Sequence, residues 1–174
     1  MKQSKPAADA VNALKCELAG EVLRSSGKLR LPSTGRSMLP TILPGDTLLI
    51  DRVLIDRTNR DTVTAGDIVL FSRNQRLFAH RVIQKSGDSQ DIRIVTQGDG
   101  LPDPDFPVNS SELMGKVAFI VRNGKCIAPS ARQSFGQRAV SALVRRSESA
   151  ARIIVGIHGM RRSATSQQDT ACQS

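Results

Sequence analysis

The chain has 174 residues, enough for one globular domain with a hydrophobic core. Aromatic residues make up only 3% of it, with no Trp or Tyr, so side chains that could stack on nucleic-acid bases are scarce and we expect no nucleic-acid partner. The net charge of +9 indicates either binding to an anionic partner, which by charge alone could be a membrane surface or nucleic acid, or a solvated basic face. Three widely spaced cysteines and two histidines form no ligand cluster, so we predict neither a metal nor a cofactor.

The N-terminal residues carry lysines, but the continuous apolar run of a secretory signal does not follow them. No stretch reaches the roughly 18 apolar residues that a membrane-spanning helix requires. The sequence therefore predicts a cytoplasmic or peripheral membrane protein, with no transmembrane segment and no signal peptide.

Apolar residues recur at helical spacing between residues 7 and 26, and Gly27 follows as a stop; they are Val11, Leu14, Leu18, Val22 and Leu23. This pattern predicts an N-terminal amphipathic helical arm over residues 1–27. Its apolar stripe is expected to dock on the body of the protein or on a partner.

From Lys28 onward the pattern changes to short runs of β-forming residues, with turns marked by three Gly-Asp pairs. Strands are predicted at about 28–32, 47–54, 67–72, 76–84, 91–97, 115–122 and 125–128. Residues 55–65 are predicted to be a loop, and residues 98–111 a longer irregular connection. We therefore predict a mainly β (α+β) domain over residues 28–128.

The last part of the chain combines apolar residues at near-helical spacing with many arginines. It predicts a basic amphipathic helix over residues 129–162, which would lie on an anionic membrane or pack on the β-domain. The polar tail, residues 163–174, is predicted to be disordered.

One short stretch could carry a nucleophile. Gly35 precedes Ser37 by two residues, and Pro40 prevents a helix from continuing, so Ser37 is predicted to lie on a tight, irregular turn. Such a turn would expose the hydroxyl together with its own backbone N–H. The alternative is an ordinary turn in which the serine bonds only its own backbone.

A serine hydroxyl needs a base, and His80 is the better placed of the two histidines. It lies in an alternating apolar run, which predicts a strand that holds the imidazole rigidly, with Phe78 and Val82 on the same face. A loop rich in proline and aspartate follows the next predicted strand. One of its carboxylates could bind the far imidazole nitrogen, although Asp-Pro clusters are also common turn formers.

These blocks occur in one order along the chain: Gly35-x-Ser37-Met38-x-Pro40-Thr41, Gly45-Asp46, Gly66-Asp67, His80-Arg81-Val82, Gly98-Asp99 and Leu113-x-Gly115-Lys116-Val117. The series, over about residues 29–122, resembles the type I signal peptidase superfamily, which includes the LexA/UmuD-type autoproteases. The resemblance implies a coiled-strand, barrel-like fold and a serine endopeptidase that cleaves after small residues and binds its protein or peptide substrate as an added strand.

The resemblance also implies roles for individual residues. Most bacterial members use lysine as the base, but this chain has His80 at that position, as do the endoplasmic-reticulum-type and sporulation-type signal peptidases. Their third catalytic member is an aspartate in the following loop, which makes Asp103 the preferred carboxylate, with Asp99 and Asp105 as alternatives.

This chain departs from the signal peptidases in two ways: it has Gly35 where many of them have an oxyanion-hole serine, and no stretch of it is predicted to form their transmembrane anchor. Two alternative functions therefore stand beside a signal peptidase. One is a LexA/UmuD-type cytoplasmic autoprotease that cuts itself at Ala19-Gly20, and the other is an inactive basic binding module on the same scaffold.

Overall fold

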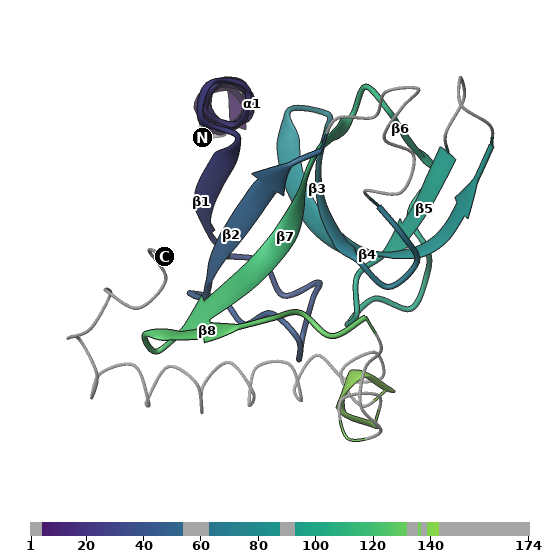
Figure 1. The fold of residues 1–174 in the computed structure, drawn as a ribbon. Helices are drawn as coiled ribbons and strands as arrows, with labels where there is room; N and C mark the ends of the chain where they lie inside the picture. The colour runs from purple at the N-terminus through teal and green to yellow at the C-terminus, as the bar shows by residue number, and fades with distance from the viewer. Residues whose placement is uncertain (1–4, 54–62, 88–92, 132–135, 137–138, 143–174) are drawn as a thin grey trace.

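The structure is a computed structural model that describes residues 5–53, 63–87, 93–131, 136 and 139–142 (Figure 1). In this part of the chain a single long helix precedes eight strands. They are α1 (Lys5–Ser26), β1 (Lys28–Pro32), β2 (Thr47–Arg52), β3 (Ile68–Arg73), β4 (Arg76–Ser86), β5 (Arg93–Gln97), β6 (Val108–Asn109), β7 (Leu113–Arg122) and β8 (Lys125–Ile127).

Every predicted strand is confirmed, and the N-terminal helix is confirmed as well. The sequence missed only β6, whose two residues lie inside the connection predicted over 98–111. Most of the loop predicted over 55–65 lies outside the described residues, and so do most of the helix over 129–162 and all of the tail over 163–174.

All strand pairs are antiparallel, in the order β1-β2-β7-β3-β4-β5-β6, with β8 also paired to β7. The mainly β fold is therefore confirmed, but the expected barrel-like closure is not found. The sheet is strongly coiled (Figure 1), yet among the described strands its edges, β1 and β6, do not pair. A barrel needs a hydrogen-bonded ladder between its first and last strands, and β6 has only two residues to offer.

Strand β3 separates two hydrophobic clusters, which explains why its first four residues are all buried. Successive side chains of a strand point to opposite faces. Ile68 and Leu70 accordingly pack into a cluster with Leu23 of α1, whereas Val69 and Phe71 pack into a second cluster with Val82 of β4. Residues of β4 that pair with Val69 and Phe71 face this second cluster.

Helix α1 docks on the sheet through Leu23 and Ala19, whose exposed fractions are 2% and 4%. Val11, Leu14 and Leu18, in contrast, are each more than half exposed. The stripe predicted from sequence is therefore divided, because only one side of the helix, near its C-terminal end, reaches the core. No helix within the described residues is long and apolar enough to cross a bilayer.

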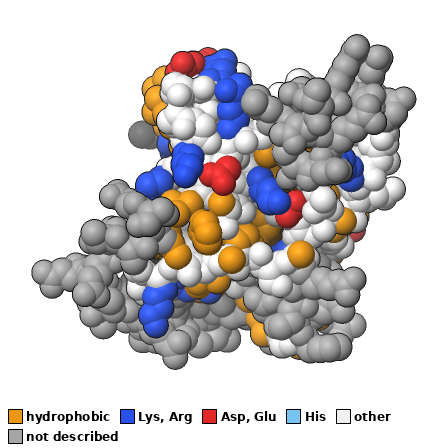
Figure 2. All heavy atoms as spheres, in the orientation of Figure 1, with side chains coloured by type: hydrophobic (Ala, Val, Ile, Leu, Met, Phe, Trp, Pro, Cys, Tyr) orange, Lys and Arg blue, Asp and Glu red, His pale blue; other side chains and the backbone are white. Residues whose placement is uncertain are grey.

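Further hydrophobic side chains are exposed on the strands. They gather in the middle of the face shown in Figure 2, next to Lys and Arg side chains. The large exposed examples on β7 and β8 are Phe119 and Ile127. Both α1 and the sheet thus present apolar surface to solvent.

Candidate active site

Ser37 lies in a turn directly after β1 and is anchored by its apolar neighbours. Met38 and Leu39 are buried, whereas Ser37 is partly exposed. The turn is closed by hydrogen bonds from the Leu39 N–H to the Arg36 carbonyl (3.1 Å) and from the Ile42 N–H to the Met38 carbonyl (3.0 Å). Burial of Met38 and Leu39 therefore fixes the backbone and leaves the Ser37 side chain at the surface, as the sequence predicted.

His80 lies in the middle of β4 and pairs with Val69 of β3, so its ring faces the second hydrophobic cluster. Its exposed fraction is 3%. The rings of Phe71 and Phe78 pack around it, each with a centroid 5.9 Å from that of the imidazole. The ring is therefore held on a rigid strand between aromatic neighbours, in the orientation that the alternation of residues 77–83 predicted.

The two ring nitrogens of this imidazole contact a serine hydroxyl and a carboxylate. Nε2 of His80 lies 2.9 Å from Oγ of Ser37, and Nδ1 lies 2.6 Å from Oδ2 of Asp105. With its hydrogen on Nδ1, the ring donates to Asp105 and can accept the Ser37 hydroxyl proton at Nε2. The geometry thus suits proton removal from Ser37 during nucleophilic attack.

The structure brings Asp105, and not the preferred Asp103, to the histidine. The connection after β5 turns at Gly98, where the Leu101 N–H donates to the Gly98 carbonyl (2.9 Å). The chain returns to the sheet at Asp105, whose N–H donates to the Thr96 carbonyl (2.8 Å). Asp103 lies on the exposed excursion between these two points. The prediction of Asp103 is therefore wrong. The length of this loop does not determine which of its aspartates returns to the sheet beside His80.

The other alternative, Asp99, has a different set of partners. It is buried and receives two hydrogen bonds from Arg81, Nε to Oδ1 (2.9 Å) and Nη2 to Oδ2 (2.8 Å). The Thr41 hydroxyl also donates to Asp99. Because Thr41 follows Ser37 in the same turn and Arg81 follows His80 on β4, Asp99 ties the serine-bearing turn to the histidine-bearing strand.

A second ion pair holds the far end of the serine-bearing loop. Asp46 is 1% exposed, and its carboxylate accepts hydrogen bonds from the Leu43 N–H (2.8 Å) and from Nη2 of Arg122 (2.6 Å). The same Arg122 nitrogen donates to the Thr41 carbonyl (2.9 Å). The loop between β1 and β2 is therefore fixed by two charged groups from elsewhere in the chain: Asp99, which follows β5, and Arg122 of β7.

Two glycines allow the connection after β5 to approach the Ser37 backbone closely. The Gly100 N–H donates to the Ser37 carbonyl (2.8 Å). A Cβ atom at Gly98 would lie only 2.6 Å from that carbonyl oxygen, and one at Gly100 would lie 3.3 Å from it. The Gly-Asp-Gly sequence is thus required here by backbone contact as well as by the Asp99 side chain.

Asp105 is kept ionised by its neighbours. Burial raises the pKa of the Asp105 carboxyl, but hydrogen bonds from His80 and from the Thr96 hydroxyl lower it more, so the net pKa lies below the ordinary aspartate value. A charged Asp105 is the form that stabilises a protonated imidazole. The site therefore contains a carboxylate suited to support proton transfer at His80.

Sequence reasoning missed Thr96, whose Oγ1 donates to Asp105 Oδ2 (2.7 Å). Thr96 is fully buried and pairs with Val82, which lies on the same face of β4 as His80. Alternation along residues 91–97 placed Thr96 on one face of a strand, but the register with β4 was needed to show that this is the histidine face.

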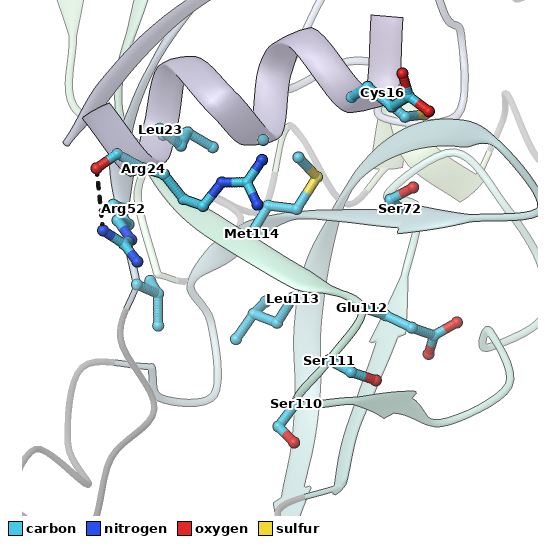
Figure 3. Close-up of a pocket in the computed structure, with 13 residues that line it drawn as sticks. Cys16, Leu23, Arg24, Arg52, Ser72, Ser110, Ser111, Glu112, Leu113 and Met114 are labelled. Carbon is cyan, nitrogen blue, oxygen red and sulfur yellow. Dashed lines mark hydrogen bonds between the residues drawn. The ribbon is translucent and has the colours of Figure 1, made fainter. Parts of the chain in front are cut away.

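The cavity shown in Figure 3 is separate from these residues. Its volume is about 550 Å³, and it lies between α1 and the chain around the start of β7; its lining includes Cys16, Leu23, Glu112 and Met114. Ser37, His80 and Asp105 do not line it. Ser37 itself is partly exposed.

Comparison with known proteins identifies the family of this chain. The model of the Peptidase S24-like family matches residues 9–118, which is more than half of the chain and includes Ser37, His80 and Asp105. No curated protein and no solved structure matches the chain. The chain therefore belongs to the S24-like peptidase family, within the superfamily of serine peptidases that includes LexA and the signal peptidases.

Proposed function

We propose that this chain is a serine endopeptidase of the signal peptidase type, with Ser37 as nucleophile, His80 as general base and Asp105 as the carboxylate that orients His80. The observation that carries this proposal is the continuous series of contacts from Ser37 Oγ through the imidazole to Asp105, at 2.9 and 2.6 Å. A histidine base relates the chain to the endoplasmic-reticulum-type and sporulation-type signal peptidases.

The reaction is acyl transfer. Ser37 Oγ attacks the substrate carbonyl carbon while Nε2 of His80 takes the hydroxyl proton, and Asp105 stabilises the imidazolium. The carbon–nitrogen bond of the substrate then breaks, and the imidazolium gives its proton to the leaving amine. Water attacks the acyl-enzyme with His80 again as base, which releases the acid product and restores the Ser37 hydroxyl.

Oxyanion stabilisation in this chain rests on backbone N–H groups, that of Ser37 among them. Gly35 carries no hydroxyl, and a Cβ atom at this position would have only Ser37 Oγ within its neighbourhood, at 4.0 Å. The site therefore has room at the position where many signal peptidases carry a serine.

The substrate would bind as an extended strand. β1 is an edge strand that pairs only with β2 among the described strands, and the chain continues from Pro32 of β1 into the turn of Ser37. A peptide added to this open edge would form main-chain hydrogen bonds and bring its scissile bond to the serine. The resemblance to signal peptidases indicates small residues such as alanine before that bond.

An active-serine phosphonate probe tests the proposal directly. Wild-type protein should be labelled at Ser37 and should cleave peptides from a small-residue library, whereas Ser37→Ala should do neither. Full cleavage by Ser37→Ala would refute the assignment of Ser37, and labelling of His80→Ala at the wild-type rate would refute the role of His80 as base.

A LexA/UmuD-type autoprotease is the second candidate, because the superfamily of the matching family includes this class as well. The small pair Ala19-Gly20 is, however, an unfavourable cleavage site in the folded chain. It lies in the interior of α1, and Ala19 is 4% exposed, so cleavage would first require the helix to unwind. Intact-mass measurement after prolonged incubation distinguishes the candidates, because only self-cleavage yields a fragment that begins at Gly20.

A further inference from the structure

Arg73, the last residue of β3, binds three segments at once. Its Nε and Nη2 donate to the two carboxylate oxygens of Glu112, at 2.7 and 2.6 Å. Its Nη1 donates to the Phe106 carbonyl (2.9 Å), and Nη2 also donates to the Pro107 carbonyl (2.8 Å). One guanidinium therefore joins the end of β3, the turn before β7 and the chain that follows Asp105.

The two carbonyls bound by Arg73 belong to the residues directly after Asp105. On the other side, the Asp105 N–H is bound to the Thr96 carbonyl (2.8 Å). The backbone of Asp105 is thus fixed between a strand hydrogen bond before its side chain and the Arg73 contacts after it. Without the second anchor, the exposed segment from Phe106 could pull the carboxylate away from His80.

Arg73 also contacts the packing around the imidazole. Its guanidinium carbon lies 5.6 Å from the centroid of the Phe71 ring, a cation–π distance. The Phe71 ring in turn packs edge-on against His80, with 5.9 Å between centroids. The same side chain therefore supports both members of the His80–Asp105 pair while it contacts neither directly in the described contacts.

The chemistry of the contacts requires an arginine. A planar guanidinium has five N–H donors in a fixed fork, which allows a bidentate bond to Glu112 and two bonds to carbonyls at the same time. A lysine would keep the positive charge and much of the apolar stem, but its single nitrogen cannot hold this geometry. The exchange of Arg for Lys thus separates geometry from charge.

We infer that Arg73 is a positioning residue for the serine peptidase reaction: it holds the Phe106 and Pro107 carbonyls so that the Asp105 carboxylate meets Nδ1 of His80. This inference rests on the proposed function for its effect on rate. Its structural part, the dependence of the His80–Asp105 contact on Arg73, stands independently of that function.

The first test compares Arg73→Lys with Arg76→Lys in the full chain. Arg76 pairs with Arg73 across the β3–β4 hairpin and is exposed, so it is a matched control for the same chemical change. The rate of Ser37 labelling by the phosphonate probe should fall about tenfold in Arg73→Lys, because a small displacement of a catalytic group is costly. It should stay unchanged in Arg76→Lys.

The second test is a double-mutant cycle with Asp105→Asn. If Arg73 acts through the Asp105 carboxylate, Arg73→Lys should cost almost nothing further in the Asp105→Asn background. An equal loss in both backgrounds would show that Arg73 only maintains the fold, and the inference would be overturned. Circular dichroism of each variant confirms that the compared proteins are folded.

The third test does not need peptidase activity. The Nδ1 proton of His80 should give a strongly downfield NMR signal in the wild type, assigned with a His158→Gln variant because the chain has only two histidines. Arg73→Lys should weaken or shift this signal, and Arg76→Lys should not. An unchanged signal would refute the inference. A changed signal together with an unlabelled wild-type Ser37 would retain it and refute the proposed function instead.

Discussion

The hydroxyl of Thr96 lies 2.7 Å from Oδ2 of Asp105, the same oxygen that contacts Nδ1 of His80. Two donors thus meet at one carboxylate oxygen, one from β5 and one from β4. Thr96 is fully buried, so water cannot replace its hydrogen bond. The contact fixes the direction of the carboxylate as well as its charge.

Thr96→Val should therefore lower the rate of peptide cleavage, whereas Thr96→Ser should retain most of it. Valine matches threonine in shape but leaves Asp105 with one donor fewer, and we expect a loss of about 1–2 kcal/mol in the free energy of unfolding at pH 7. Cleavage kinetics and urea unfolding at pH 7 measure the two effects. Equal kinetics in the Val and Ser variants would contradict a role for the hydroxyl.

Substitution of Asp105 should lower activity, whereas substitution of Asp99 should lower stability. Asp105→Asn should fold normally but lose about 10³–10⁴-fold in rate, because the imidazole is no longer held in the productive tautomer. Asp99→Ala should leave the buried Arg81 without its bidentate partner and cost about 3–5 kcal/mol in stability. Thermal unfolding together with probe labelling separates them, and a stable, fully active Asp105→Asn would be the contrary result.

Gly98→Ala should disrupt the nucleophile through the backbone. Its Cβ would lie 2.6 Å from the Ser37 carbonyl oxygen, so the turn or the connection after β5 must move. We expect about a 100-fold slower labelling of Ser37. Gly20→Ala is the control, since its Cβ meets only ordinary contacts in α1 and should stabilise the helix by up to about 1 kcal/mol. Similar labelling of both variants would show that the contact with Ser37 is not needed.

The Arg73–Glu112 pair should make stability depend on pH in the acid range. The hydrogen bond from Arg73 lowers the pKa of the Glu112 carboxyl, and burial opposes it only in part. A lowered folded pKa means that the contribution is complete above the ordinary glutamate value of about 4.3 and disappears as the pH falls through the folded value. The free energy of unfolding of the wild type should therefore exceed that of Glu112→Gln by about 1 kcal/mol at pH 7.

This difference should shrink as the pH falls below the ordinary glutamate value and vanish once the Glu112 carboxyl is protonated in the folded protein, because both proteins then carry an uncharged side chain at position 112. Urea unfolding of both proteins between acid and neutral pH measures it. A difference that stays constant over the whole range would show that the charge of Glu112 does not contribute.

The order of strands along the chain was predictable because alternation and Gly-Asp turns are local signals. So was the rigid placement of His80, since an alternating apolar strand directs successive side chains to opposite faces. No local sequence signal, in contrast, predicted the ion pair of Arg81 and Asp99, although both residues lie in sequence motifs of the family resemblance. Their contact depends on how the connection after β5 folds over the turn of Ser37.

The sequence by itself therefore determined a β-rich domain, the turn that exposes Ser37 and the strand that carries His80. Only the tertiary structure decided that Asp105, and not Asp103, contacts His80, that Thr96 and Arg73 bind Asp105 and the residues after it, and that β1 and β6 do not pair among the described strands. The physical reason is the same in each case. Loop path and strand register are set by hydrogen bonds between residues far apart in the chain, such as Asp105 N–H to Thr96 and Gly100 N–H to Ser37, and spacing along the sequence does not encode them.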